Sequence, residues 1–493
     1  MTEKKRFDSY PLVMLVGGLF MFLFGYIFPP FNSVITAMGM RMLGVLIGLI
    51  IITCFNGDLL GGALMALLAT VIHGYMDPIE LLGTWLGSEF TVQLVFCGAI
   101  CLALKESGAM NVIAKKILTS KLCKGRPVMT MVMLFLATYV VSAFLDSAPT
   151  YLLFFGLIES IRDVCGYSKK DPFIKFALLG AYIAATGVFF FPFKAPQVMT
   201  IGMINAAMEP YGRTLSGGTW MLVMFLTTMI YMVVYAVMMK TVYKLNLEPI
   251  KTLDFGKIET LRNTPDKFNK DQKAILGLLL GCIAYILFTT AYPSTAPLYD
   301  ILTSLNTAWI WILGVTICAL IRNKETGRSY IPITKFLTES SFWPMIALVG
   351  ALVLLGKTTS DASLGIRPWL VDTLQPVFGN NNIWLLMGIV ILFCTLVTQI
   401  ANGLVLSLAV CPIVTPFACE MALKTSINPD VVLIISNVCS AYAFWTVASS
   451  SNAAYILGRP EIDQKFIWTK GVGQTFVFMA VTYICGMVFT FVL

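Results

Sequence analysis

Charge is scarce in this sequence. Lys, Arg, Asp and Glu make up 12% of the 493 residues, whereas 58% are hydrophobic. A soluble globular protein carries about 25% charged residues, so the composition excludes an ordinary soluble enzyme. The net charge is +8, and the positive residues gather in a few loops between apolar runs. That distribution is typical of membrane topology and gives no reason to expect nucleic acid as a partner.

Several chemical motifs are also missing. His73 is the only histidine, and the 12 cysteines contain no CxxC pair, so we expect no resident cofactor, no metal site beyond a possible sodium ion and no disulfide framework. Neither an HExxH zinc motif nor a GxxxxGK(S/T) phosphate loop occurs. These absences argue against a membrane-embedded enzyme and against a built-in ATPase. We predict that the chain is not an enzyme.

Long apolar runs dominate what is present. Residues 11–28, 221–239 and 468–493 form three of them. Each is near the roughly 20 residues that a helix needs to cross about 30 Å of hydrocarbon. Backbone polar groups must be satisfied inside lipid, and the runs lack the alternation of barrel strands, so they must be helices. The sequence therefore predicts an all-α polytopic membrane protein.

Charged loops predict the orientation of this protein in a cell (plasma) membrane. Basic residues at 4–6 precede the first run, which places the N-terminus in the cytoplasm. That run is too long for a signal-peptide core and lacks a small-residue cleavage site, so we expect it to be retained. Loop 242–272 is the longest hydrophilic stretch, is rich in lysine, and is expected to be cytoplasmic. Following the spans from there places the C-terminus outside.

Four apolar segments are interrupted by polar or proline-containing sequence. The segment 127–157 is broken by FLDSAPT (144–150) and has basic residues at both ends, which is typical of a hairpin that enters and leaves on one side. The next, 172–208, is broken by FFFPFKAPQ (189–197). In the second half, TQIANG (398–403) and TVASSSN (446–452) interrupt two further segments.

The interruptions recur at matched spacing. Asp146 and Asn402 are 256 residues apart, and Lys194 and Ser449 are 255 apart. Two halves of opposite orientation with broken helices are typical of inverted-repeat secondary transporters. We therefore predict an N-terminal span (1–40), a first repeat (41–241), a cytoplasmic linker (242–272) and a second repeat (273–493). The first repeat contains a hairpin (127–160) and a broken helix (172–208), and the second contains a hairpin (383–419), a broken helix (430–458) and a last span (468–493).

At these four breaks the chain resembles the divalent anion:sodium symporter family, within the wider ion transporter superfamily. The likeness runs from about residue 80 to the C-terminus and begins with ALKESGAMNVIAKKIL (103–118). FLDSAPTYLLFF occupies the place of the family's first Ser-Asn-Thr tip. TQIANGLVLSLAVCPI (398–413) occupies the second, where the family typically has a Thr-Glu start and a Pro-Ile end. FKAPQ (193–197) and ASSSNAAYILG (448–458) stand where the family has Thr-Pro-Pro-Asn-like turns.

The resemblance implies about eleven transmembrane helices plus two re-entrant hairpins. It also implies an elevator-type transporter: a homodimer with a fixed scaffold domain and a sliding transport domain. Family substrates are di- and tricarboxylates or sulfate, mostly driven by sodium. The tips depart from the family, because the first Ser-Asn-Thr becomes Asp146-Ser147-Ala148 and the second becomes Asn402-Gly403-Leu404.

The breaks supply the candidate site residues. Helix N-termini at a hairpin tip suit an anion, and unwound carbonyl groups suit a sodium ion. The candidates for substrate binding are Ser147, Thr150, Lys194, Asn402, Gly403 and Asn452. The candidates for ion binding are Asp146, Thr398, Asn402, Ser449, Ser450 and Asn452. Taken singly, small polar residues also serve helix packing in lipid, but their clustering at the breaks favours function.

Asp146 and Lys194 are the sharpest candidates, because intramembrane charges are costly. Both lie at breaks of the first half, so we expect them to face each other, although a lysine can also extend to the membrane surface. One hypothesis is that the Lys194 ammonium replaces a sodium ion at the first tip. The alternative hypothesis is that Asp146 carries a proton.

These patterns favour a secondary active transporter of a small anion, sodium-coupled or exchanging one anion for another. A cation/proton antiporter of the same superfamily, with Asp146 as the ion-binding carboxylate, is the alternative within the class. A membrane-embedded enzyme or a channel is the alternative of another class. The expected partners are a small anionic substrate, the lipid bilayer and, from the resemblance alone, a second copy of the chain.

Overall fold

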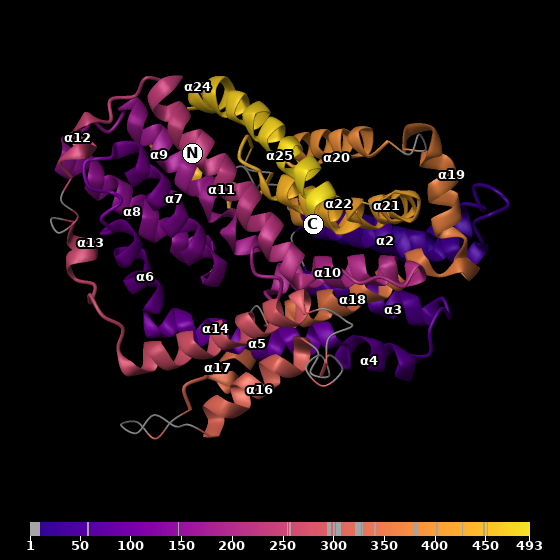
Figure 1. Cartoon of the computed structure of the whole chain (residues 1–493). Coiled ribbons are helices and arrows are strands. Elements are labelled where there is room, and N and C mark those ends of the chain that lie inside the picture. The colour runs from indigo at the N-terminus through magenta and orange to yellow at the C-terminus, as the bar shows by residue number, and fades with distance from the viewer. Residues whose placement is uncertain are drawn as a thin grey trace, which may run out of the picture.

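The structure is a computed structural model, drawn in Figure 1. It describes residues 10–56, 59–145, 147–253, 255, 258–292, 297–298, 301, 307–320, 327, 329–339, 342–378, 382–400, 403–425, 427–446, 449–450 and 452–493. The first half contains α1 (Tyr10–Ile27), α2 (Ala37–Asn56), α3 (Leu59–Ile72), α4 (Pro78–Leu86), α5 (Glu89–Ser107), α6 (Ala109–Leu118), α7 (Pro127–Phe144), α8 (Ser147–Cys165), α9 (Pro172–Ala184), η1 (Ala185–Phe189), α10 (Ala195–Met208), η2 (Glu209–Tyr211) and α11 (Gly217–Thr241).

The remaining elements are also helical. They are α12 (Glu248–Lys251), α13 (Glu259–Arg262), α14 (Lys270–Ala291), α16 (Thr307–Leu320), α17 (Ile333–Leu337), α18 (Phe342–Ser360), η4 (Ala362–Leu364), α19 (Ile366–Phe378), α20 (Ile383–Val397), α21 (Gly403–Lys424), α22 (Pro429–Ala441), α23 (Ala453–Leu457), α24 (Gln464–Phe466), η6 (Ile467–Gly471) and α25 (Val472–Val492).

Six helical segments within the described ranges are long and apolar enough to cross a membrane. They are Tyr10–Ile27, Pro78–Ser107, Pro127–Phe144, Pro172–Phe189, Gly217–Thr241 and Gln464–Val492. Several shorter apolar helices accompany them. The prediction of an all-α polytopic membrane protein is therefore confirmed. The division into inverted repeats, the number of spans and the elevator movement stay predictions.

Local sequence determines where several helices begin and end. The Ser88 side chain accepts a hydrogen bond from the N–H of Thr91 and so caps the start of α5. Gly108 ends the same helix with a φ of 69°, a left-handed conformation that favours glycine. Asn269 and Gln272 form a reciprocal capping box at the start of α14. Such caps satisfy backbone groups that the helix itself leaves unpaired.

One packed group is built on α1, α2 and α3, together with α4, α10 and α18. Figure 1 shows α2, α3, α10 and α18 side by side. The contact between α1 and α2 is close: a Cβ added to Gly48 would lie 2.4 Å from the carbonyl oxygen of Gly17. Small residues that let backbones approach are a common device for helix packing in lipid.

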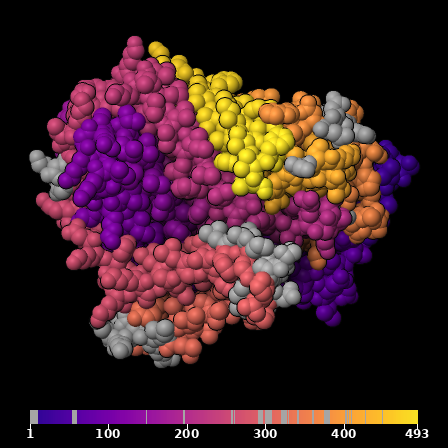
Figure 2. Space-filling model, in the orientation of Figure 1, coloured from indigo at the N-terminus to yellow at the C-terminus, as the bar shows by residue number. Residues whose placement is uncertain are grey.

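The larger group contains most of the interrupted segments and the helices around them. Its buried side chains come from α5 to α11, from α14 and α16, and from α20 to α25. In Figure 2 the yellow C-terminal helix lies across magenta residues of the first half, in agreement with the contact between α25 and α11. Helix α10 packs on both α18 and α21. The two halves of the sequence are therefore interleaved.

All four interruptions appear as breaks between helices. Helix α7 ends at Phe144 and α8 begins at Ser147, while α9 passes through η1 before α10 starts at Ala195. In the second half α20 ends at Val397 and α21 begins at Gly403, and α22 is separated from the short α23. These breaks expose backbone groups that no helix satisfies, so their hydrogen-bond partners identify the candidate site.

Candidate functional site

The second break, between η1 and α10, brings Lys194 to the tip of the first hairpin. The Nζ of Lys194 donates a hydrogen bond of 2.9 Å to the carbonyl oxygen of Leu145, the residue that ends α7. Lys194 is half-buried and directly precedes α10, for which it is the N-cap residue. An ammonium group therefore lies against a backbone carbonyl one residue before Asp146. Asp146 itself lies outside the described residues, so its contact with Lys194 stays a prediction.

The first turn of α8 carries the other candidates of the first half. Ser147 opens the helix and is half-buried, and Thr150 is fully buried one turn later. Tyr151 follows Thr150 and is 4% exposed. The Ser147 side chain is within hydrogen-bonding reach of the Tyr151 hydroxyl. The N-terminus of α8 therefore offers hydroxyl groups where the helix dipole favours negative charge.

In the second half, the hairpin tip is packed against the end of α22. The Thr398 hydroxyl donates a hydrogen bond of 2.6 Å to the carbonyl oxygen of Ser440. A Cβ added to Gly403 would lie 1.9 Å from that same oxygen and 2.8 Å from the Thr398 Oγ1. Only glycine allows this approach of two backbones. Asn402, a substrate and ion candidate beside Gly403, lies outside the described residues.

Gln399 bridges this tip to the broken segment after α22. It is fully buried, and its Oε1 accepts hydrogen bonds from the N–H groups of Phe444 at 3.1 Å and Trp445 at 3.3 Å. Its Nε2 donates to the carbonyl oxygens of Thr395 and Tyr442. We did not predict a role for Gln399, and the only signal in the sequence was its place inside TQIANG.

The remaining candidates, at the break between α22 and α23, form hydrogen bonds with residues close in sequence. The buried Ser449 Oγ donates to the carbonyl oxygen of Thr446 at 2.6 Å, and the N–H of Asn452 donates to the Ser450 Oγ at 3.1 Å. The Thr446 hydroxyl in turn donates to the carbonyl oxygen of Gln399 at 2.7 Å. These bonds join the second hairpin tip and the second broken helix into one connected unit.

Tyrosines connect the breaks of the two halves. The buried Tyr182 of α9 donates a hydrogen bond of 2.7 Å to the carbonyl oxygen of Ala443, and Ser450 is within hydrogen-bonding reach of its hydroxyl. The ring of Tyr151 lies 5.2 Å from that of Tyr182, in a stacked arrangement, and 5.4 Å from that of Tyr455. The first turn of α8 therefore lies beside the second broken helix. Nothing in the sequence distinguished these tyrosines from other apolar-run aromatics.

An ion-pair cluster lies where α8 and α9 meet the segment after α23. Glu461 is 5% exposed and pairs with Arg162 at 3.5 Å and with Arg459 at 3.3 Å. Arg459 also pairs with Glu159 of α8. Lys175 pairs with Asp463, and its hydrogen bond lowers the pKa of that carboxyl group below its ordinary value. Like the tyrosines, these pairs connect the first hairpin to the second half.

The arrangement contains the groups that an anion and a small cation require. Hydroxyl groups, backbone carbonyls and one ammonium group meet at the breaks, whereas the described residues contain no cluster of three His, Cys, Asp or Glu side chains that could hold a metal ion. Two cavities, of about 490 and 150 Å³, lie elsewhere, next to Arg213 and Asp430 and next to Lys124 and Phe255. A single cavity lined by Ser147, Lys194, Asn402 and Asn452 stays a prediction.

A family model decides the class of this protein. The model named CitMHS, citrate transporter, matches residues 58–330, which is more than half of the chain. The chain belongs to the citrate transporter family. It is therefore a multi-pass membrane transporter of the ion transporter superfamily, as the resemblance at the breaks predicted. The match includes the first two breaks and ends before the second hairpin.

Two solved transporter structures share the fold. MtrF of Neisseria gonorrhoeae, described within a class of antimetabolite efflux pumps, matches with a TM-score of 0.57 and 11% identity, and the alignment covers 99% of this chain and 96% of MtrF. The YdaH transporter of Alcanivorax borkumensis matches with a TM-score of 0.52 and 14% identity, over 97% of this chain and 98% of YdaH. No curated protein sequence matches the chain.

Proposed function

We propose that this member of the citrate transporter family is a secondary active transporter of a small di- or tricarboxylate or a sulfate-like anion. The observation that carries the proposal is the Lys194 ammonium at the first tip, 2.9 Å from the Leu145 carbonyl oxygen. A positive charge beside the N-terminus of α8 favours a carboxylate there. The family's description as citrate transporters supports the same substrate class.

The substrate would meet residues from both halves. Ser147 and Thr150 start α8, and Tyr151 brings this turn against Tyr182 and Tyr455. We assign substrate binding to Ser147, Thr150, Lys194, Asn402, Gly403 and Asn452. Hydroxyl and amide groups at these positions would bind carboxylate oxygens, while Lys194 would supply the balancing charge.

Sodium, if it couples transport, would bind in the second half. Thr398, Ser449, Ser450 and Asn452 offer neutral oxygen atoms beside the backbone carbonyls of the broken segment, with Asn402 as a further oxygen donor. The Thr398 hydroxyl donates its proton to Ser440 and so keeps oxygen lone pairs for a cation. In the first half, the Lys194 ammonium would take the place of a sodium ion, which moves the protein toward anion exchange or toward coupling through one ion site.

Counterflow in proteoliposomes tests this function directly. The purified protein is reconstituted with one unlabelled anion inside, and uptake of labelled mono-, di- and tricarboxylates and sulfate is measured in sodium and in choline. We expect saturable uptake of a di- or tricarboxylate or sulfate that depends on the internal anion. Uptake unchanged by choline would remove the sodium site and favour exchange. Cation-for-proton exchange without anion counterflow would replace the proposal with the antiporter alternative.

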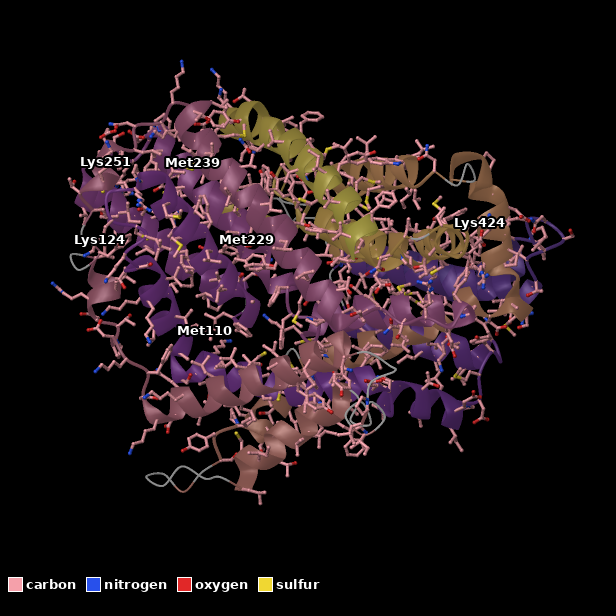
Figure 3. All side chains as sticks on the ribbon, in the orientation of Figure 1. Met110, Lys124, Met229, Met239, Lys251 and Lys424 are labelled. Atoms are coloured by element: carbon pink, nitrogen blue, oxygen red, sulfur yellow. The ribbon has the colours of Figure 1, made fainter. Side chains whose placement is uncertain are left out.

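The proposed orientation in the plasma membrane has the N-terminus inside and the C-terminus outside. In Figure 3, Lys124 and Lys251, which lie in the predicted cytoplasmic loops, are at one end of the molecule, and Lys424 is at the opposite end. The assignment itself rests on the basic loops of the sequence. Protease removal of a C-terminal epitope tag in intact cells tests it, and a tag cleaved only after lysis would reverse the assignment. A homodimer is proposed from the family resemblance and is tested by mass measurement in detergent.

A further inference from the structure

The side chain of Gln399, in the second hairpin tip, contacts four backbone groups. The fully buried amide donates from Nε2 to the carbonyl oxygens of Thr395, at 3.0 Å, and Tyr442. Its Oε1 accepts from the N–H groups of Phe444 at 3.1 Å and Trp445 at 3.3 Å. Three of these four groups belong to the unwound segment that follows α22.

The chemistry of these partners matches a neutral amide and excludes a carboxylate. A backbone carbonyl can only accept and a backbone N–H can only donate, so two donor bonds and two acceptor bonds are needed. Rotating the amide by 180° would set donors against donors and acceptors against acceptors at all four contacts. A carboxylate would place negative charge against two carbonyl oxygens. A protonated carboxyl group, with one donor, would restore part of the pattern.

The bonds matter because the unwound segment lies between membrane helices. A backbone group left unpaired in hydrocarbon costs several kcal/mol. Gln399 satisfies groups on residues 442, 444 and 445 at once, and its own carbonyl accepts from the Thr446 hydroxyl at 2.7 Å. Both acceptor positions of its Oε1 are already used, so this side chain positions its neighbours and is not itself a ligand.

We propose that Gln399 is a positioning residue that holds the second hairpin tip and the unwound segment in one geometry. In this chain that geometry requires an uncharged side chain at the position where the divalent anion:sodium symporter family typically has the Glu of its Thr-Glu start. The inference rests on the proposed function, because the positioned groups are those assigned to anion and ion binding. A neutral amide does not titrate, so Gln399 itself adds no pH dependence to this half of the site. A titratable group of the same length would make the geometry depend on its protonation.

Gln399→Glu tests the inference, with Gln474→Glu as a matched control. Gln474 is also fully buried, but its side chain contacts the hydroxyl groups of Tyr231 at 3.2 Å and Tyr243 at 2.8 Å. Hydroxyl groups can rotate to donate to a carboxylate, whereas backbone carbonyls cannot. Burial raises the pKa of a carboxyl group above its ordinary value. The ionisation of the introduced glutamate is therefore followed between about pH 5.5 and 9.

We expect the apparent KM for the anion in Gln399→Glu to be near that of the parent at the acidic limit and to rise at least about tenfold at the alkaline limit. Gln474→Glu should show less than a threefold rise. Gln399→Met, which has no polar group, should raise KM at every pH. The thermal midpoint of each purified variant, measured over the same pH range, gives a second readout that does not require transport.

The outcomes separate this inference from the proposed function. If the parent shows no anion counterflow, the proposed function is wrong. In that case a thermal midpoint that depends on pH only in Gln399→Glu still supports the positioning role. If Gln399→Glu matches the parent in KM and midpoint at every pH, or if Gln399→Met transports like the parent, the inference is wrong. A pH dependence of equal size in Gln474→Glu would also overturn it, because the effect would then follow burial alone.

Discussion

The two hairpin tips are held by different chemistry. At the first, a charged ammonium group from Lys194 donates to the carbonyl that ends α7. At the second, the neutral amide of Gln399 and the hydroxyls of Thr398 and Thr446 make the equivalent connections. The first tip contains a fixed cation, the Lys194 ammonium group, and therefore does not need a bound sodium ion. The second tip is neutral and rich in oxygen atoms, so it can bind a sodium ion. From this difference we propose that ion coupling, if present, is asymmetric between the halves.

Lys194→Ala should give the largest effect, because it removes the only charge described at the first tip. We expect anion binding to weaken about a hundredfold or to become newly dependent on sodium, since hydrogen bonds to a charged group contribute up to about 3 kcal/mol. Binding is measured by isothermal calorimetry with and without sodium. Lys116→Ala, which removes an exposed lysine beside Phe268, is the matched control and should bind like the parent.

The hypothesis that Asp146 carries a proton makes a different prediction for the first tip. If Asp146 carries a proton, Asp146→Asn should flatten the pH dependence of transport while anion binding survives. If the ammonium replaces sodium, the pH response of Lys194→Ala should change little. Parent-like transport by both variants at every pH and sodium level would show that neither charge belongs to the mechanism, and Lys194 would then be a residue that extends toward the surface.

Gly403→Ala should break the second tip without changing its charge. The new methyl group would lie 1.9 Å from the Ser440 carbonyl oxygen, and that neighbour is backbone and cannot turn away. We expect a loss of about 2–3 kcal/mol in stability, a lower thermal midpoint and little or no counterflow. Gly277→Ala on α14 is the control, because a Cβ there meets nothing within 4 Å. Normal counterflow by Gly403→Ala would contradict the close packing of this tip.

Glu461→Gln tests whether the ion-pair cluster keeps the two tips in one unit. Glu461 is 5% exposed and lies between Arg162 and Arg459, so its removal leaves two guanidinium groups without their shared partner. Arg162 keeps its pair with Asp163 and Arg459 keeps its pair with Glu159, so we expect a loss of about 1–2 kcal/mol, seen as a lower midpoint in thermal unfolding. The substitution should affect both halves of the site together, because the cluster joins α8 to the second broken helix. An unchanged midpoint would show that the connection is dispensable.

The sequence predicted the apolar helices and the breaks between them, but not the contacts that join the breaks. Apolar runs and the interruptions at FLDSAPT, FKAPQ and TQIANG are local signals, and the helices end there. Gln399 and Tyr182 act through residues such as Tyr442 and Ala443, which are distant in sequence or belong to the other half. The periodicity of apolar residues along the chain does not predict contacts between residues that are distant in sequence. Basic residues such as Arg162, expected to mark only a cytoplasmic loop, also pair with acids across the halves.

The smallest effect is expected for Asp463→Asn, the exposed counterpart of Glu461→Gln. Its side chain is 54% exposed, so we expect a change of at most about 1 kcal/mol. The hydrogen bond from Lys175 lowers the pKa of Asp463 in the folded state. The pair therefore stabilises the fold above the ordinary value of about 3.9, and the contribution is lost as pH falls through the lowered pKa.

Parent and Asp463→Asn should consequently give parallel pH profiles of counterflow between pH 5 and 8. A profile that diverges inside this range would show that the Lys175–Asp463 pair takes part in transport. If the profiles are parallel but slope, neither Asp463 nor the neutral Gln399 accounts for the slope. The titrating group would then be sought at the first tip, where Asp146 and Lys194 supply the charges, and Asp146→Asn would have to remove the slope.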